Sequence, residues 1–266
     1  MPFTLSHCAA ALPFRRSRLP LSALLVGCLA PDFEYLVRLS DYDRIGHTFP
    51  GFLLVTLPAS FLFLWLFHEF LRWPLCALLP RPLEQRTAAI PQEFSFRGPA
   101  RAGLVILGLA TGIATHITWD SFTHGDSWVA LHWSFFHYRF TLSDRLRVPV
   151  YAVLQGISTL AGLAAVACWF TGWLRRTSPA RPDPRFRVLP EWFKLALLAM
   201  MAAFALALAY CLTLQQFGPF VRRAVPGFFY ADMAAKSLAL FSWQLLLYAA
   251  AWTALARKPR ARTLAS

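Results

Sequence analysis

Acidic side chains are scarce in this sequence, and charge of either sign is sparse. The 266 residues include 13 Asp and Glu against 26 Lys and Arg, and charged residues make up 15% of the chain. A soluble domain normally carries about 25% charged residues. Several apolar runs instead approach the roughly 20 residues that a helix needs to cross a bilayer. The composition excludes an ordinary soluble domain and predicts an all-α, polytopic membrane helical bundle, with one membrane-embedded domain over residues 1–266.

Paired cysteines are also absent. The five cysteines are scattered singly, without CxxC spacing. An odd number of isolated cysteines gives no disulfide framework.

The basic residues are distributed unevenly along the chain. A net charge of +13 would suggest a nucleic-acid partner in a soluble protein, but here the arginines cluster between apolar runs. That pattern is typical of cytoplasmic loops. We therefore predict the lipid bilayer, and no nucleic acid, as the partner. The positive-inside rule places residues 71–101, residues 175–191 and the C-terminus in the cytoplasm.

Hydropathy predicts about six transmembrane segments. Five long spans are expected, with a shorter one at about 19–36. The five long spans cover about 51–70, 103–123, 149–171, 193–214 and 237–256. Residues 1–165 would form a metal-site half and 166–266 a set of supporting helices.

The first 35 residues predict a short helical hairpin. Residues 3–13 would form one arm, Arg15–Arg18 the turn at the inner interface, and 19–31 the second arm. Each arm is too short to cross the membrane fully, so the arginines would snorkel. This arrangement would bring His7 and Asp32 to the same depth.

Three ionisable residues form a stripe in the third of these runs. His116, Asp120 and His124 lie at i, i+4 and i+8 in the segment LVILGLATGIATHITWDSFTHG, which is otherwise apolar. Ionisable groups at membrane depth are costly, so they mark a functional site by default. Imidazole and carboxylate are also the usual nitrogen and oxygen ligands of divalent metals. The predicted orientation places this stripe in the outer half of its span.

Residues from separate stretches are expected to reach the same layer. His47 lies just before the next outer helix end, and Asp32 follows Pro31, which tends to end or kink a helix. The expected layer contains His7, Asp32, His47, His116, Asp120 and His124. A plain Asp–His pair could also satisfy Asp120. Six convergent ligand-type residues fit a divalent metal better, and zinc is favoured because histidine dominates. The set exceeds one tetrahedral site, so one or two ions are expected.

Other polar groups are weaker signals. Gln155, Ser158 and Thr159 lie at i, i+3 and i+4 in the outer half of a span, where they could orient ligands or simply bridge helices. Asp232 and Lys236, at i and i+4 near a helix start, are most simply a surface pair.

Five segments resemble a bacterial membrane-protein family of unknown function, numbered 4184. They are MPFTLSH at the start, LAPDFEY around Asp32, GHTFPG at His47, HITWDSFTHGD at 116–126 and YAVLQGISTLAG at 151–162. That family is similar to inner-membrane metal-dependent hydrolases and, more distantly, to zinc-dependent phospholipase C. The relatives usually show a Ser-His-Ser-like string where this chain has Gly46-His47-Thr48, but the histidine is kept.

The resemblance implies metal binding by all six residues named above and a bacterial inner-membrane location. The leading hypothesis is a metal-dependent hydrolase of a lipid-linked or amphipathic ester, such as a phosphoester, at the outer leaflet. Asp120 or Asp32 would act as ligand or general base. An ion or metal transporter and a non-catalytic, metal-stabilised scaffold are the alternatives. Residues 103–115, on the inner side of the stripe, are rich in glycine and alanine and carry no ionisable group, which disfavours a transport path.

Overall fold

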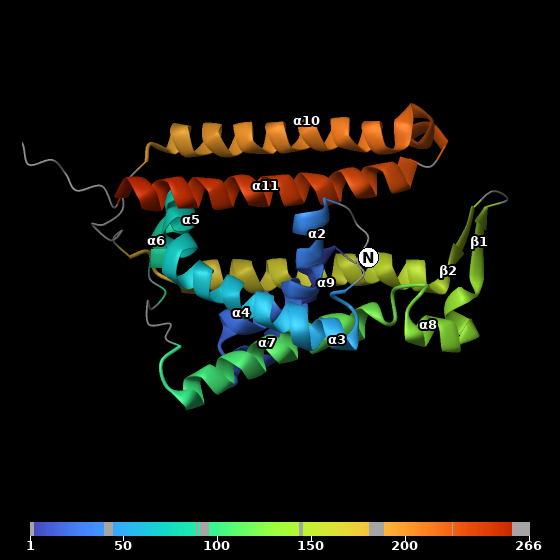
Figure 1. Ribbon diagram of the computed structural model, residues 1–266, viewed down its shortest axis with the longest axis horizontal. Helices are drawn as coiled ribbons and strands as arrows, with labels where there is room; N and C mark the ends of the chain where they lie inside the picture. The colour runs from blue at the N-terminus through green and yellow to red at the C-terminus, as the bar shows by residue number, and fades with distance from the viewer. Residues whose placement is uncertain are drawn as a thin grey trace, which may run out of the picture. The chain divides into compact units, whose positions relative to one another are not determined.

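The structure is a computed structural model that describes residues 3–39, 45–88, 90, 96–143, 146–180, 189–224 and 226–256. These residues are almost entirely helical, with one two-stranded sheet among them (Figure 1). The chain divides into two compact units. The first unit comprises residues 1–34, 43–64 and 93–177, and the second comprises 35–42, 65–92 and 178–266. That both units belong to one membrane-embedded domain, as the sequence predicts, stays a prediction.

Five helices among the described residues are long and apolar enough to cross a membrane. They are Phe49–Leu78, Pro99–Asp120, Val150–Arg176, Glu191–Arg222 and Gly227–Leu255. Each contains most of one of the five long spans that hydropathy predicts. The prediction of an all-α, polytopic membrane protein is therefore confirmed. Residues 257–266, whose cytoplasmic side was predicted, lie outside the described residues.

The N-terminal hairpin forms within the first unit. Its first arm, η1 (Thr4–Arg16), is a 3-10 helix, and its second arm is α1 (Leu21–Leu29). Pro31 then tightens the chain into η2 (Ala30–Asp32), which leads into α2 (Phe33–Arg38). The shorter run at 19–36 is thus three consecutive pieces. The change from α1 to η2 places Asp32 just beyond the second arm, in the last position of η2.

Helix α1 packs on α7 (Pro99–Asp120) at very short range because both helices carry glycine at the contact. A Cβ atom at Gly112 would lie 2.4 Å from the Leu24 carbonyl oxygen, and one at Gly27 would lie 2.3 Å from the Leu109 carbonyl oxygen. Only glycine allows backbones to approach so closely. A core of Ala23, Val26, Leu64, Val105 and Leu109 surrounds this contact.

The first arm is held by α9 (Val150–Arg176). A Cβ atom at Gly162 would lie 2.7 Å from the carbonyl oxygen of Ser6, so the two backbones touch. The Phe3 amide also donates a hydrogen bond of 3.1 Å to Thr159 Oγ1. Thr159 therefore links α9 to the start of η1, which agrees with the prediction that it bridges helices. Both contacts position His7, the neighbour of Ser6.

The span Phe49–Leu78 is built of five consecutive pieces, two of them π-helical turns. Such turns are rare and occur often at functional sites. The pieces are α3 (Phe49–Gly51), the π-helix η3 (Phe52–Thr56), α4 (Leu57–Leu66), the π-helix η4 (Phe67–Leu71) and α5 (Arg72–Leu78). The first of these pieces begins directly after the loop that carries His47.

A small lobe connects α7 to α9 in the first unit. It comprises α8 (Trp128–His132), the 3-10 turn η5 (Ser134–His137) and the antiparallel strands β1 (Arg139–Ser143) and β2 (Leu146–Pro149). Figure 1 shows these elements together beyond the N-terminal end of α9.

The second unit contains α5, α6 (Arg81–Ala88) and the long helices α10 (Glu191–Ala224) and α11 (Pro226–Ala256). Helix α10 is interrupted at Gly218, whose φ of 71° lies in the left-handed region that glycine tolerates. Helices α10 and α11 pack along one another.

The prediction of a surface pair at Asp232 and Lys236 is wrong. Asp232 is fully buried between α10 and α11, and Lys236 is almost fully buried. Lys236 Nζ donates to Asp232 Oδ2 and, over 2.8 Å, to Gln216 Oε1. Thr213 Oγ1 donates to the same Asp232 oxygen over 2.7 Å. The two residues do pair at i, i+4, but α10 packs over this face of α11 and buries the pair. The spacing of residues along α11 does not encode this packing.

Candidate metal centre

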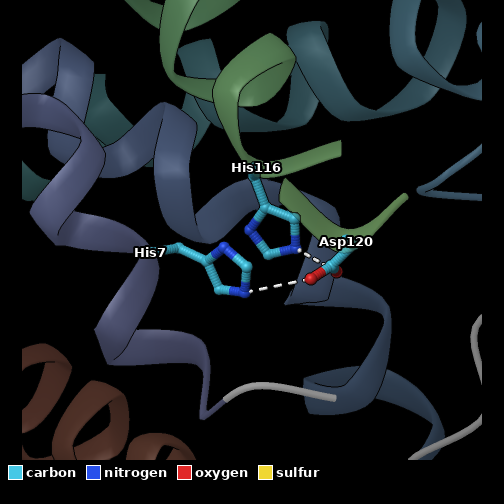
Figure 2. A group of neighbouring side chains, drawn as sticks. All are labelled: His7, His116 and Asp120. Carbon is cyan, nitrogen blue, oxygen red and sulfur yellow. Dashed lines mark ion pairs between the residues drawn. The ribbon is translucent and has the colours of Figure 1, made fainter. Parts of the chain in front are cut away.

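The last turn of α7 supplies the core of a buried histidine–carboxylate cluster. His116 is fully buried and Asp120 is 3% exposed. One helical turn apart, they point the same way, and His116 Nε2 lies 3.1 Å from Asp120 Oδ2. Figure 2 shows both side chains converging with His7. His116 and Asp120 of the predicted stripe therefore share a real face of α7, directed into the first unit, whereas His124 lies beyond the end of the helix.

The imidazole of His116 is oriented by the neighbouring helix. His116 Nδ1 lies 2.6 Å from the backbone carbonyl oxygen of Cys28 in α1. A carbonyl oxygen accepts only, so Nδ1 carries the proton and donates it. Nε2 then presents its lone pair to the cluster. Metal-bound histidines are characteristically fixed by this kind of outer hydrogen bond.

His47 reaches the cluster from the loop before α3. Gly46 allows this approach, because a Cβ atom there would lie 2.3 Å from the Pro31 carbonyl oxygen. The loop is fastened by Glu34 Oε2, which accepts hydrogen bonds from the amides of Ile45 (3.0 Å) and Gly46 (3.2 Å). The loop sequence thus brings His47 against the segment that contains Asp32.

Four ligand atoms lie at the spacing of a metal coordination sphere. His47 Nε2 is 3.2 Å from His116 Nε2 and 3.1 Å from Asp120 Oδ2. Asp32 Oδ1 is 3.5 Å from His116 Nε2 and 4.0 Å from His47 Nε2. Two ligands of a tetrahedral zinc ion at about 2.0–2.1 Å would lie about 3.3–3.4 Å apart. The separations within this group therefore fit a single ion, with Asp32 slightly outside.

His7 approaches the opposite oxygen of Asp120. Its Nε2 lies 3.3 Å from Asp120 Oδ1, and its ring stacks on that of His116 with centroids 3.8 Å apart (Figure 2). Trp119 packs edge-on against the same imidazole at 5.5 Å. His7 lies outside the five apolar spans, and burial lowers its pKa. Its neutral form, the one that binds metals, is thereby favoured.

Several buried atoms of the cluster have no hydrogen-bond partner among the described residues. Asp32 Oδ2 and His7 Nδ1 belong to this group, and His7 Nε2, Asp120 Oδ1 and Asp32 Oδ1 have only the ion-pair contacts described above. Buried polar atoms left in this state are costly. A cation bound among them would satisfy oxygens and nitrogens together. The donor set therefore fits a divalent metal, and His7, His116 and Asp120 form one potential ligand group while Asp32, His47 and His116 form another.

His124 takes a different position from the other five residues. Its Nδ1 lies 3.0 Å from the Asp120 backbone carbonyl oxygen and 3.8 Å from the carboxylate oxygen Oδ1. The side chains of His124 and His47 are 24% and 20% exposed, whereas the other predicted ligands are nearly inaccessible. The structure thus brings together His7, Asp32, His47, His116 and Asp120, and places His124 against the Asp120 backbone at an exposure similar to that of His47.

The supporting groups were missed by reasoning from the sequence. Trp119, Glu34 and the Cys28 carbonyl oxygen all contact the cluster or its loop, but none belongs to a recognised ligand pattern. The GxxxG spacing of Gly108 and Gly112 in α7 could have revealed the close approach of α1, since this motif marks helix packing in membranes.

Comparisons with known proteins gave one match. No curated protein and no solved structure was found to be similar to this chain. The model of a family described as "Domain of unknown function (DUF4184)" matches residues 1–257, which is nearly the whole chain. The chain is a member of the DUF4184 family.

Proposed function

We propose that this protein is a membrane-embedded, metal-dependent hydrolase that acts on a lipid-linked or amphipathic ester, with a phosphoester as the first candidate. The observation that carries the proposal is the group of His47 Nε2, His116 Nε2 and Asp120 Oδ2 at mutual distances of 3.1–3.2 Å. A divalent metal held there would polarise a phosphoryl or carbonyl oxygen and activate a water molecule for attack. Zinc is the proposed metal because histidines dominate the donor set.

The two aspartates are proposed to have different roles. Asp120 faces His116 and His47 through one carboxylate oxygen and His7 through the other, which suits a ligand. Both of its oxygens would therefore be available to hold a divalent metal. Asp32 lies farther from the histidines, and neither of its oxygens has a hydrogen-bond partner among the described residues. Asp32 is therefore the better candidate for a general base, a role that requires an oxygen able to accept a proton.

An apolar groove beside the cluster supports a substrate with a hydrocarbon chain. The groove has a volume of about 530 Å³ and follows one face of α7. It is lined by Ala10, Thr111, Ala114, Thr115, Thr118, Trp119 and Phe122. The hydroxyls of Thr111 and Thr115 donate to backbone carbonyls of their own helix, so they present little free polarity. Trp119 lines the groove and also contacts the His7 ring. This tryptophan therefore connects the groove to the cluster.

The same helix disfavours transport as the function. N-terminal to His116, the residues that α7 buries are apolar or glycine. They are Val105, Gly108, Leu109, Gly112 and Ile113. A translocation path for an ion or proton would require polar groups along this face.

Metal analysis and turnover together test the proposal. Purified wild type should contain about one or two zinc ions per chain, whereas His116→Ala and Asp120→Asn should contain less than a tenth of that. His132→Ala, which removes an exposed histidine outside the cluster, should retain the full amount. Zinc-loaded protein in proteoliposomes should release phosphate or a headgroup from lipid phosphoesters, and Asp32→Asn should abolish turnover.

The outcomes separate the three functions. Wild type without any bound divalent metal would disprove the metal centre. Bound zinc that raises thermal stability without turnover on any ester would favour the scaffold. Zinc or proton flux through proteoliposomes, lost in His116→Ala, would favour the transporter.

A further inference from the structure

The lobe between α7 and α9 has to lie at a membrane face. It comprises residues 127–149 and joins Asp120, the last residue of one candidate span, to Val150, the first of another. Ser127 Oγ donates to the Ser121 carbonyl oxygen over 2.6 Å, which fastens the lobe to the end of α7. At its other end, the Val150 amide donates to the Tyr138 carbonyl oxygen over 2.9 Å. The lobe is thus tied at both ends to helices of membrane-spanning length.

The lobe has a small core of its own. Ala130, Phe136 and Val150 are buried together, and Tyr151 and Leu154 pack against them. Ser127 also caps α8 by accepting a hydrogen bond of 3.2 Å from the Ala130 amide. The lobe is therefore a folded element, and the side chains on its outside are held there by this internal packing.

Those outer side chains are mainly aromatic. Trp128 is 69% exposed, Trp133 58%, Phe135 63% and Tyr138 63%. An aqueous surface would not favour so many large apolar groups in one short segment. Tryptophan and tyrosine combine an apolar ring with a polar group, and they concentrate where lipid headgroups meet the hydrocarbon region.

The hairpin of β1 and β2 adds a basic face to this aromatic surface. Arg139 and Thr141 lie on the same face because side chains alternate along a strand. Arg147 pairs with Thr141 across the hairpin and therefore shares that face. Phe140 and Val148, which also pair, lie on the other face. Arg139 and Arg147 are exposed, so this face of the hairpin carries two cations, and Arg139 directly follows the exposed Tyr138 in the chain.

We propose that this lobe is seated in the headgroup layer of the bilayer, where its aromatic side chains lie among the glycerol groups and Arg139 and Arg147 bind lipid phosphates. Charge complementarity favours anionic lipids as the occupant. The inference goes beyond the proposed function, since it holds whether or not the histidine cluster is catalytic. Because the lobe follows directly from the end of α7, it would set the depth of His116 and Asp120 relative to the headgroups.

Fluorine NMR on the full chain in nanodiscs tests the depth of the lobe. The protein is labelled with 5-fluorotryptophan, and the signals of Trp128 and Trp133 are assigned by their loss in Trp128→Phe and Trp133→Phe. Three paramagnetic agents are compared: one in water, one on a lipid headgroup and one near the end of an acyl chain. Trp65, inside the span Phe49–Leu78, serves as the internal control for a deep position.

We expect the headgroup agent to broaden Trp128 and Trp133 at least twice as strongly as the other two agents, whereas Trp65 responds most to the acyl-chain agent. Three results would overturn the proposal. Broadening mainly by the water-soluble agent would place the lobe in solution. Broadening mainly by the acyl-chain agent would place it in the hydrocarbon region. Protection from all three agents would mean that another protein, or a second copy of this chain, covers the surface.

The arginines are tested by lipid preference. In nanodiscs that mix phosphatidylglycerol and phosphatidylcholine, energy transfer from tryptophan to a headgroup-labelled lipid reports which lipid lies beside the protein. Replacing both residues, Arg139→Gln with Arg147→Gln, should reduce the enrichment of the anionic lipid by roughly fivefold per arginine at low salt. Arg139→Lys with Arg147→Lys is the matched control and should retain most of it. Unchanged enrichment in the glutamine variant would refute phosphate binding by these residues.

Discussion

The imidazole Nδ1 of His116 lies 2.6 Å from the backbone carbonyl oxygen of Cys28, across the interface of α7 and α1. This contact depends on Gly27 and Gly112, which let the two backbones meet. A helix-packing motif therefore determines which nitrogen of the histidine faces the cluster. The orientation of the His116 imidazole and the packing of the two helices are linked through this one hydrogen bond.

Gly112→Val should damage both stability and metal binding. The new Cβ would lie 2.4 Å from the Leu24 carbonyl oxygen and 2.7 Å from the Cys28 amide nitrogen, which are backbone atoms that cannot move aside cheaply. We expect a loss of about 3 kcal/mol in the free energy of unfolding, together with reduced zinc content. Gly103→Val in the same helix is the control, because nothing lies within 4 Å of its Cβ position. Equal unfolding midpoints of the two variants in detergent would contradict the close packing.

His47→Ala and His124→Ala should differ sharply in metal affinity. His47 Nε2 is 3.1 Å from Asp120 Oδ2, whereas the nearest nitrogen contact of His124 to the same carboxylate is 3.8 Å. Removal of His47 should lower zinc affinity by at least about a hundredfold, and removal of His124 by no more than about tenfold. Competition with a chromophoric chelator measures both. Comparable losses would restore His124 to the ligand set.

Thr48→Val should loosen the loop that carries His47. Thr48 Oγ1 accepts a hydrogen bond of 3.1 Å from the Gly51 amide and donates one of 2.9 Å to the Ile45 carbonyl oxygen. Loss of this N-cap should cost about 1 kcal/mol of stability and lower zinc affinity. Thr48→Ser keeps the hydroxyl and should behave like wild type in thermal unfolding and metal titration. A serine variant as impaired as the valine variant would assign the effect to packing of the methyl group.

Lys236→Met should be strongly destabilising, although a surface pair would contribute only about 0–1 kcal/mol. The substitution leaves the Asp232 carboxylate without its cation in a fully buried position. We expect the free energy of unfolding of Lys236→Met to fall by about 3–5 kcal/mol. The double variant Asp232→Asn with Lys236→Met removes both charges and should recover most of it. A double-mutant cycle of unfolding midpoints measures the coupling, and a coupling near zero would contradict the buried pair.

Much of the fold and most of the candidate cluster could be predicted from the sequence. Long apolar runs define spans almost by themselves, since a bilayer requires a minimum helix length. The cost of burying Asp120 in such a run pointed to a site, and the hairpin prediction placed His7 and Asp32 beside it. These inferences rest on local spacing and on general physical costs, which a single sequence carries.

The features that could not be predicted depend on which helix faces pack against one another. His124 shares the helical spacing of His116 and Asp120, but α7 ends at Asp120, so the helix geometry assumed for His124 does not apply. Asp232 and Lys236 look like a surface pair until α10 covers them. The role of Cys28 belongs to its backbone, so no property of its side chain could have revealed it. Such facts follow from tertiary packing, which spacing along one chain does not encode.

The 3-10 geometry of η1 has a consequence for how the length of this segment can vary among relatives. With three residues per turn, each inserted or deleted residue would rotate the preceding part of the arm by about 120° and shift it by about 2 Å. A change of one or two residues between Ala11 and Arg16 would therefore turn His7 away from Asp120, and a change of three would restore its facing but displace it by about 6 Å along the arm. The length of this segment should accordingly be the same among relatives that keep the cluster.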